Sequence, residues 1–357
     1  MPNLFPVITG DIGGTNARFE WIGDVDAPPR SLGTVKTADY DGPEAAILAC
    51  LERADLPRPK TALLAAAGPI TDEGLDLTNC AWVIRPDPFL ETTGFSRLQL
   101  LNDFEAQALA LPFFAASDVC AISGPRSGSR LGRRSQSAPT ATPMKDSNTF
   151  TKAVLGPGTG LGVGFMVRAQ GKWVPVPGEG GHVDLGPRTP FEAKLWPHLN
   201  TIGGRISAEQ ILSGDGLENL HQAMQKTLQS DDGQTNVGFR TAPQITAAAL
   251  EDGGSIAART LNLFCTVLGR LAGDLAVTSM AYGGVYLAGG IVQKIAPFVH
   301  TSGFREAFED KAPHTELMRT MPTWLVQHEL PALLGLAQLA KRPDDFLMDM
   351  DHRSWDI

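Results

Sequence analysis

The first strongly patterned stretch of the chain is an apolar run at residues 5–8, followed by a glycine-bearing polar turn and an alternating apolar and polar run at residues 17–22. Such alternation predicts a half-buried strand, and two extended segments around paired glycines predict a β-hairpin. The turn also contains Asp11, Thr15 and Asn16, polar side chains that a hairpin tip does not require. Paired glycines let a backbone approach a bulky anion with its N–H groups. The pattern fits either a plain tight hairpin or a phosphate-binding turn.

The rest of the first 111 residues alternates strand-like and helix-like patterns, which is typical of an α/β domain. A strand is predicted over residues 61–67, where Gly68-Pro69 ends it, and another over residues 98–101. The second strand leads into a predicted helix over residues 104–111 that stops near Pro112.

Residues 123–149 break this alternation, because Ser, Pro, Arg and Thr dominate there and five basic residues stand against one acidic residue, Asp146. Such a segment cannot bury enough apolar area to order itself, so a mobile surface insertion is predicted. A basic docking segment is the alternative.

The opening pattern returns after this segment. Residues 153–155 predict a strand, residues 156–162 a glycine-rich loop and residues 163–167 another strand. The loop could expose successive N–H groups to a phosphate, with a hydroxyl from Thr159, or it could be a tight turn in a glycine-rich sheet. Two half-chains that each open on such a turn indicate a duplicated α/β architecture with a ligand held between two lobes.

Helical patterns fill residues 207–212, 216–228 and 245–281. A short strand over residues 285–287 then ends at Gly289-Gly290 before another helix. This turn leaves space for a flat adenosine ring, although close packing alone would also account for the glycines.

Length and composition limit the class of protein. A chain of 357 residues is longer than most domains with a single hydrophobic core, which favours two lobes. Its content of 43% hydrophobic and 19% charged residues is ordinary for a globular enzyme. A net charge of −9 argues against a nucleic-acid-binding protein with a broadly basic surface. The four cysteines are scattered without a CxxC pair, which indicates reduced thiols in a cytoplasmic protein.

The two most apolar stretches considered, near the N-terminus and at residues 275–292, indicate neither a targeting signal nor a membrane span. No Lys or Arg precedes the first apolar run, so it does not resemble a signal peptide. Residues 275–292 lack charge, but glycines interrupt them, and a buried helix running into a buried strand is the better interpretation. We therefore expect a soluble protein with no membrane and no nucleic-acid partner.

Asn102-Asp103 joins the predicted strand at 98–101 to the following helix. Both residue types are favoured at helix N-caps for local reasons. A carboxylate at the C-terminal end of a strand also lies where α/β folds place reactive groups, and a sugar hydroxyl that attacks phosphorus needs a carboxylate to accept its proton. From these residues alone, both the capping and the catalytic interpretations remain open.

A second polar group lies in a stretch too rich in glycine for a helix, where Glu179 and His182 stand three residues apart. Together they could hydrogen-bond a polyhydroxylated ligand, whereas one His and one Glu are too few ligands for a zinc site. Glu209 lies in a Ser-Ala-Glu-Gln sequence with the form of a capping box, so it is either a first-turn acid or a ligand-binding residue. The chain has no strict GxGxxG and no Walker P-loop, so phosphate must bind at the hairpin turns.

Taken in order, seven motifs resemble the bacterial glucokinase family, within the sugar-kinase, actin and Hsp70 superfamily. They are D-I-G-G-T-N-A-R (11–18), T-N-C-A-W (78–82), L-N-D-F-E-A (101–106), G-P-G-T-G-L-G (156–162), P-G-E-G-G-H (177–182), S-A-E-Q-I-L-S-G (207–214) and L-A-G-G-I (287–291). The similarity covers nearly the whole chain apart from the 123–149 insertion and the C-terminal tail.

The resemblance implies an α/β fold of the two-lobed actin-like ATPase (ribonuclease H-like) type with its active-site cleft between the lobes. A small α/β domain would span residues 1–111 and be completed by residues 329–357, and a large α/β domain would span residues 112–328. The implied activity is that of a glucokinase, which uses ATP and Mg²⁺ to phosphorylate D-glucose at its 6-hydroxyl. The products would be glucose 6-phosphate and ADP, and the reaction would feed glycolysis. A homodimer is also implied.

The same resemblance assigns roles to individual residues. Asp103 would be the general base, Asn102 would hold neighbouring hydroxyls, and Glu179, His182 and Glu209 would hydrogen-bond the rest of the sugar. Asp11 would hold Mg²⁺ through water. The residues expected to bind ATP are Asp11, Gly13, Gly14, Thr15 and Asn16, with Gly158, Thr159 and Gly160 opposite them at the phosphates, and Gly289 and Gly290 beside the adenosine.

Two alternatives stand beside this interpretation. Residues that bind hydroxyl groups look the same in sequence for different sugars, so the substrate could be mannose, fructose or glucosamine. A non-catalytic sugar sensor is disfavoured, because Asp103 is present and no helix-turn-helix segment precedes the first strand. The sister family of repressors and open-reading-frame kinases carries clustered zinc-binding cysteines after its Gly-His segment, and this chain has none there.

Overall fold

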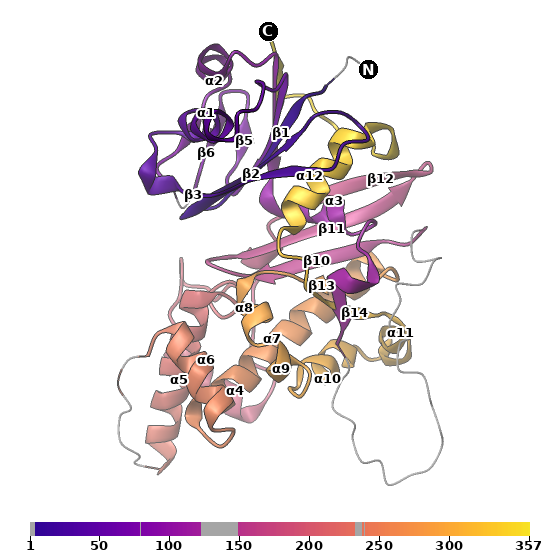
Figure 1. Ribbon diagram of the computed structural model, residues 1–357. Helices are drawn as coiled ribbons and strands as arrows, with labels where there is room; N and C mark the ends of the chain where they lie inside the picture. Colours follow the sequence, from indigo (N-terminus) through magenta and orange to yellow (C-terminus); the bar gives the residue numbers. More distant parts are fainter. Residues whose placement is uncertain (1–3, 79, 123–148, 233–237, 239) are drawn as a thin grey trace. The chain divides into compact units, whose positions relative to one another are not determined.

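The structure is a computed structural model that describes residues 4–78, 80–122, 149–232, 238 and 240–357 (Figure 1). By its contacts the chain divides into two compact units. Unit 1 comprises Met1–Phe114, Gly164–Pro177 and His328–Ile357, and unit 2 comprises Ala115–Val163 and Gly178–Gln327. Residues 164–177 therefore fall in unit 1, although the sequence placed them in the large domain. The predicted insertion at 123–149 lies, apart from Thr149, outside the described residues.

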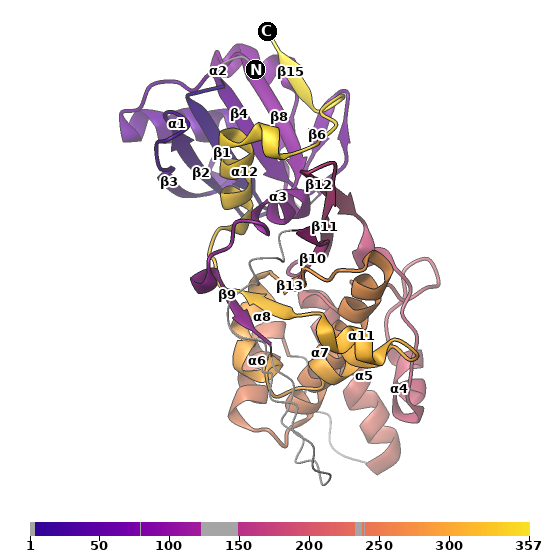
Figure 2. The same cartoon turned by 90° about the vertical axis from the view of Figure 1, so that its right-hand side faces the viewer.

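A six-stranded sheet forms the centre of unit 1, in the order β15-β8-β4-β1-β2-β3. Its strands are β1 (Val7–Ile12), β2 (Asn16–Ile22), β3 (Arg30–Lys36), β4 (Thr61–Ala66), β8 (Arg97–Asn102) and β15 (Ser354–Asp356). Strand β2 pairs antiparallel with both β1 and β3, whereas β4 pairs parallel with both β1 and β8. Strand β15 pairs antiparallel with the outer edge of β8, as Figure 2 shows. The predicted hairpin and both predicted strands that follow it are confirmed.

Helices pack on this sheet because its central strands are apolar on both faces. Every residue of β4 is buried, as expected for a parallel strand covered on two sides. The helices of unit 1 are α1 (Pro43–Ala54), α2 (Pro86–Thr93), α3 (Asp103–Ala110) and α12 (Pro331–Lys341). Helix α12 packs on β1, β4 and α3. A small sheet of β5 (Ile70–Thr71), β6 (Gly74–Asp76) and β7 (Val83–Ile84) completes the unit.

The contact between α12 and α3 depends on a glycine. A Cβ atom at Gly335 would lie 2.0 Å from the carbonyl oxygen of Ala106 and 2.9 Å from Cβ of Leu109. Any side chain at this position would force the two helices apart, so α12 sets the position of α3 closely.

The second sheet has the order β12-β11-β10-β13-β14-β9. Its strands are β9 (Val119–Ala121), β10 (Lys152–Pro157), β11 (Leu161–Ala169), β12 (Lys172–Gly178), β13 (Val285–Leu287) and β14 (Thr323–Val326). Strands β10, β13 and β14 run parallel, and β9 pairs antiparallel with β14. The strands predicted at 153–155, 163–167 and 285–287 are confirmed.

Helices account for most of the remainder of unit 2. They are α4 (Pro190–Leu195), α5 (Gly214–Asp232), α6 (Ala242–Glu251), α7 (Ile256–Ser279), α8 (Gly290–Lys294), α9 (Ala296–Val299), α10 (Phe304–Glu309) and α11 (Thr315–Thr320). Among the described helices, α7 alone is long and apolar enough to cross a membrane, but 72% of that window is buried inside the protein. The helix packs on α5, α6, α10 and β10. It is therefore a core helix, and the strand after it, β13, is buried as predicted.

Two helix predictions are wrong. Residues 207–212 form turns instead of a helix, because the N–H groups of Ala208 and Glu209 bond the carbonyls of Val183 and Gly181 in a neighbouring segment. The pattern at 245–281 is two helices, α6 and α7, separated at residues 252–255. Ser255 begins the second helix by accepting a hydrogen bond from the N–H of Ala258, so its cap and the preceding glycine pair override the continuous apolar pattern.

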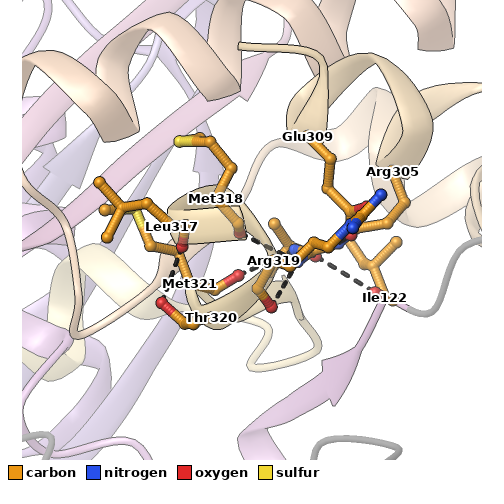
Figure 3. Close-up of polar contacts among 9 residues, drawn as sticks. Ile122, Arg305, Glu309, Leu317, Met318, Arg319, Thr320 and Met321 are labelled. Carbon is orange, nitrogen blue, oxygen red and sulfur yellow. Dashed lines mark hydrogen bonds and ion pairs between the residues drawn. The ribbon is translucent and has the colours of Figure 1, made fainter. Parts of the chain in front are cut away.

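An arginine in α10 fastens several segments of unit 2 together (Figure 3). The Arg305 guanidinium donates to the carbonyls of Met321 at 2.9 Å and of Met318 and Arg319 at 3.3 Å. It also donates to Oγ1 of Thr323, whose hydroxyl in turn donates to the carbonyl of Ile122, the residue after β9. Glu309 balances the charge at 2.7 Å. Arg305 thus links α10, the end of α11, β14 and β9.

Candidate active site

The turn between β1 and β2 is closed by a hydrogen bond from the Gly13 N–H to the carbonyl of Asn16, at 2.9 Å. Its tip, Gly13 to Thr15, is exposed. Thr37 holds the turn from outside the hairpin, because its hydroxyl donates to the Gly14 carbonyl at 2.9 Å and its N–H to the Thr15 carbonyl at 3.0 Å. These contacts occupy carbonyl groups, which suits a turn whose N–H groups meet an anion.

Asp11 lies on β1 just before this turn and faces Arg18 across the hairpin. Its Oδ2 is 3.7 Å from Nη1 of Arg18. Burial raises the pKa of the Asp11 carboxyl, and the positive charge of Arg18 opposes that effect. Among the described residues no three His, Cys, Asp or Glu side chains gather as a protein-only metal site would need. A single carboxylate does fit Mg²⁺ that arrives bound to phosphates and keeps several waters.

Asn102 and Asp103 lie where β8 becomes α3. Asn102 is the N-cap, and its Oδ1 accepts hydrogen bonds from the N–H groups of Phe104 at 2.9 Å and Glu105 at 3.3 Å. Oδ1 of Asp103 accepts from Phe104 as well, at 2.9 Å. Both side chains are half-buried. The capping role of Asn102 is therefore real, and its amide nitrogen is the atom that can donate to a ligand hydroxyl.

The register of the sheet places these two groups at one edge. Ile12 on β1, Ala66 on β4 and Asn102 on β8 are partners across adjacent parallel strands. Since neighbouring strands are about 4.8 Å apart, the ends of β1 and β8 are separated by roughly 10 Å. The glycine turn and Asp103 thus share the carboxyl edge of one sheet, where α/β folds bind ligands.

In unit 2 the turn between β10 and β11 is tied to its surroundings on both sides. The Gly158 N–H bonds the Gly160 carbonyl at 2.8 Å, and the Gly158 carbonyl accepts from the N–H of Gly214 at 2.9 Å. Oε2 of Glu209 accepts from the N–H of Leu161 at 2.8 Å. A Cβ on Gly160 would lie 2.5 Å from that same oxygen. Glu209 therefore lies against the turn instead of beginning a helix.

The segment with Glu179 and His182 packs on β11 through its glycines. A Cβ on Gly181 would lie 2.1 Å from the carbonyl oxygen of Leu161, so this position accepts no side chain. Oε2 of Glu179 is 3.6 Å from Nε2 of His182, and the two side chains are 84% and 53% exposed. The N–H of Glu209 donates to the Gly181 carbonyl at 2.8 Å. The structure thus brings Glu179, His182, Glu209 and the second glycine turn together.

Gly289 and Gly290 join this group at the end of β13. Gly289 has a φ of +90°, which favours glycine, and a Cβ there would lie 2.5 Å from the carbonyl oxygen of Pro157. Gly290 begins α8 with open space around its Cβ position. Close packing therefore explains Gly289, whereas the openness at Gly290 suits a ligand. The predicted residues form two groups, one in each unit.

Sequence reasoning missed a charged pair beside Asp103. Glu105, in the first turn of α3, is fully buried and contacts Arg353 from the C-terminal tail. Burial raises the pKa of the Glu105 carboxyl, and the charge and hydrogen bonds of Arg353 oppose that effect. The presence of Glu105 among the apolar residues of α3 indicates that it has a buried partner. No feature of the neighbouring sequence identifies that partner as Arg353, which is 248 residues away.

Comparison with known proteins finds consistent matches over nearly the full chain. A family model described as glucokinase matches residues 8–343. Glucokinase from Rhizobium etli is 46% identical over 354 residues, covering 99% of this chain and 97% of its own. The crystal structure of glucokinase from an Antarctic psychrotroph has a TM-score of 0.75 at 30% identity, covering 93% of this chain and 97% of its own.

A more distant structure shares the fold alone. The ROK family glucokinase from Streptomyces griseus, crystallised with glucose and AMPPNP, has a TM-score of 0.57 at 19% identity, covering 94% of this chain and 99% of its own. Together these likenesses confirm the two-lobed actin-like fold predicted from the motifs.

Proposed function

The chain belongs to the glucokinase family and phosphorylates glucose, and we propose that Asp103 is the general base of this reaction and ATP its phosphoryl donor. The observation that carries the proposal is the placement of Asp103 at the carboxyl end of β8, on the same sheet edge as the Asp11 turn. A base for the sugar and a turn for the phosphates are the two parts that phosphoryl transfer to a hydroxyl requires.

In this mechanism the 6-hydroxyl of glucose donates its proton to the Asp103 carboxylate as its oxygen attacks the γ-phosphorus. The bond from the γ-phosphorus to the β,γ-bridging oxygen breaks, and ADP leaves with that oxygen. The hydrogen bond from the Phe104 N–H to Oδ1 fixes the orientation of that carboxylate. The positive end of the α3 dipole lies at the same turn and stabilises its negative charge. Catalysis then consists of holding the hydroxyl in line with the bond that breaks and removing its proton as negative charge develops on the departing ADP oxygen.

For the nucleotide we propose the residues on both glycine turns. Asp11, through water, would hold the Mg²⁺ that arrives with ATP as part of the substrate, and Arg18 limits the local excess of negative charge. The phosphates would lie against the remaining residues of the two turns, Gly13, Gly14, Thr15, Asn16, Gly158, Thr159 and Gly160. Gly290, and Gly289 beside it, would border the adenosine.

For the sugar we propose Asn102, Glu179, His182 and Glu209. The side chains of Glu179 and His182 are exposed, and the glycines between them pack on β11, so both side chains can meet hydroxyls without a change in the fold. Oε2 of Glu209 is held by the N–H of Leu161, which leaves Oε1 to face a hydroxyl. Such donors and acceptors around one sugar bind hydroxyl groups at defined positions and so select among sugars.

A coupled assay with glucose, ATP and Mg²⁺ tests the function directly. We expect ADP formation that depends on all three components. Comparing kcat/KM for glucose, mannose, fructose and glucosamine tests the substrate, and a tenfold preference for another hexose would contradict the glucose assignment. Glucose binding by calorimetry without ADP formation would instead identify a sensor.

Two further proposals concern the state of the protein in the cell. We propose a homodimer, as the family resemblance implies, and a cytoplasmic location. Light scattering of the purified protein measures the first, and cell fractionation with an antibody measures the second. A monomer at assay concentration, or recovery with the membrane fraction, would overturn the respective proposal.

A further inference from the structure

The C-terminal tail, residues 344–357, lies beyond the region that the family model matches. It runs back along β8 as β15, with Ser354 opposite Gln99 and Asp356 opposite Arg97. The Leu100 N–H donates to the Arg353 carbonyl at 3.0 Å. Because the strands are antiparallel, Arg353 is the tail residue directed toward the end of β8 that carries Asn102.

Arg353 makes its side-chain contacts at that end. Its Nη1 donates to Oε1 of Glu105 at 3.0 Å and to Oε2 at 2.9 Å, and its Nε donates to the Asp349 carbonyl at 2.7 Å. The Glu105 side chain is fully buried, and that of Arg353 is 19% exposed. A buried carboxylate without this partner would be an uncompensated charge, so the pair strongly resists separation.

Glu105 connects this pair to the catalytic turn. It lies two residues after Asp103 in the first turn of α3, and its N–H donates to the capping oxygen of Asn102 at 3.3 Å. A shift of the Glu105 side chain therefore moves the cap on which the Asp103 carboxylate depends. An effective general base must stay within hydrogen-bond reach of the hydroxyl it deprotonates, so small shifts are costly.

The tail is also attached by contacts that do not involve Glu105. Besides the pairing of β15, Nη2 of Arg97 donates to Oδ2 of Asp356 at 3.1 Å, and Nε2 of Gln99 donates to Oγ of Ser354 at 3.3 Å. The Asp356 contact lies at the opposite end of β15 from Arg353, whereas Ser354 is the residue that follows Arg353. Removing the Arg353 side chain therefore separates a local effect on α3 from loss of the tail.

We propose that Arg353 and Glu105 are positioning residues, through which the C-terminal tail holds the first turn of α3 and keeps Asp103 in its catalytic orientation. The inference rests on the proposed role of Asp103. Arg353 touches neither substrate nor nucleotide in this account and acts only through Glu105.

The test compares Arg353→Met with the matched control Asp356→Asn, which weakens the ion pair between Asp356 and Arg97. We expect Arg353→Met to lower kcat about tenfold or more while the KM for glucose changes less than about threefold. Asp356→Asn should leave both within about twofold of wild type. A kcat of Arg353→Met within twofold of wild type would overturn the proposal.

A double-mutant cycle distinguishes positioning from general support of the fold. If Arg353 acts through Asp103, the Arg353→Met substitution should lower kcat in the wild-type enzyme but should not lower the kcat of Asp103→Asn any further. An equal fold-loss of kcat in the wild type and in Asp103→Asn would show that Arg353 acts independently of Asp103, which would overturn the proposal. Failure of the proposed function gives a different result, because Asp103→Asn would then keep high activity by itself.

Arg353→Lys is the second variant, which tests the proposal if Arg353→Met does not fold. It retains a positive charge beside Glu105 but not the guanidinium geometry. We expect a folded enzyme with a circular-dichroism spectrum like that of wild type, a kcat lowered about threefold or more, and an unchanged KM for glucose. An unchanged kcat in this variant would overturn the proposal.

Discussion

The two six-stranded sheets are built alike. In the first sheet, three consecutive strands, β1-β2-β3, lie beside β4 and β8, and in the second sheet β10-β11-β12 lie beside β13 and β14 in the same way. The sixth strand has a different origin in the two sheets. In unit 1 it is β15, which follows every other strand in the sequence, and in unit 2 it is β9, which precedes the others. Each sixth strand pairs antiparallel with its neighbour, so both cover an edge that would otherwise be open.

An arginine is associated with each of these edges, and the two bind different groups. Arg305 donates mainly to backbone carbonyls (Figure 3). It reaches the end of β9 through the hydroxyl of Thr323. Arg353 precedes β15 and donates to the buried carboxylate of Glu105, two residues from Asp103. Two edges of similar construction therefore differ in what their arginines hold: Arg305 fastens segments of unit 2, and Arg353 contacts the helix that begins at Asp103. Four experiments separate changes that affect stability from changes that affect the reaction.

The largest effect is expected for Asp103→Asn. The amide keeps the size and hydrogen bonds of the side chain but cannot accept the proton, so kcat should fall about 10³-fold or more with little change in glucose affinity. Steady-state kinetics and calorimetry measure the two quantities. Asp87→Asn is the control, because Asp87 is an exposed acid in the first turn of α2. A variant that retains a third of the wild-type kcat would show that Asp103 is not the base.

Arg305→Met should show the opposite behaviour. Losing the charge-assisted hydrogen bonds to three carbonyls and a hydroxyl should lower the free energy of unfolding by about 3 kcal/mol or more, with kcat and KM within about twofold at temperatures where the enzyme is folded. Urea denaturation measures the loss. Arg319→Met is the matched control. The Arg319 side chain is 53% exposed and pairs with the exposed Glu316 and with Glu309, which keeps Arg305 as its partner, so the free energy of unfolding should fall by less than about 1 kcal/mol. A selective loss of kcat in Arg305→Met would abolish the contrast with Arg353.

Lys152 tests a buried charge in unit 2 through pH. Burial lowers the pKa of Lys152, at the start of β10, to about 8 from 10.5. The unfolded chain therefore binds more protons between these pH values, and wild-type stability should rise with pH relative to Lys152→Met, by up to roughly 3 kcal/mol. Urea midpoints from pH 7.5 to 10 measure the difference. Lys36→Met, which changes an exposed lysine in β3, should show no such slope. A flat difference for Lys152→Met would contradict the expectation.

The smallest effect is expected for Glu179→Gln. The carboxylate is 84% exposed, so its loss should not affect folding, but a weaker acceptor should raise the KM for glucose about tenfold with a smaller change in kcat. Kinetics at varied glucose measure this, and Glu316→Gln, an acid of similar exposure on α11, is the control. An unchanged KM would remove Glu179 from the sugar-binding set.

Local signals were sufficient where the chemistry lies in contiguous segments. The hairpin at Asp11, the cap at Asn102 and the turn at Gly158 each combine a strand with glycines or capping residues, and the structure contains all three. The same rules failed at residues 207–212, where the form of a capping box predicted a helix. There the backbone of Ala208 and Glu209 bonds residues 183 and 181, and no local pattern reveals such a partner.

Long-range partners explain the rest of what was missed. Glu105 and Arg353 are 248 residues apart in sequence, and the three residues of β15 carry too little pattern to predict a strand. Gly335 is likewise unremarkable in sequence, yet its contact with Ala106 sets the spacing of α12 and α3. Such pairings depend on the completed fold, because only the packed sheet brings these segments together.

The late position of β15 has a consequence for the order in which the protein is made. The strands of the second sheet all lie between residues 119 and 326, so a ribosome has delivered them before α12 and β15 are synthesised. The sheet that begins with β1 must wait for both, since α12 covers it and β15 closes its edge. Domains generally form as units during translation, and contacts of large sequence separation form slowly. The part of the enzyme that is synthesised first is therefore the part that matures last, and Asp103 becomes fully supported only when that happens.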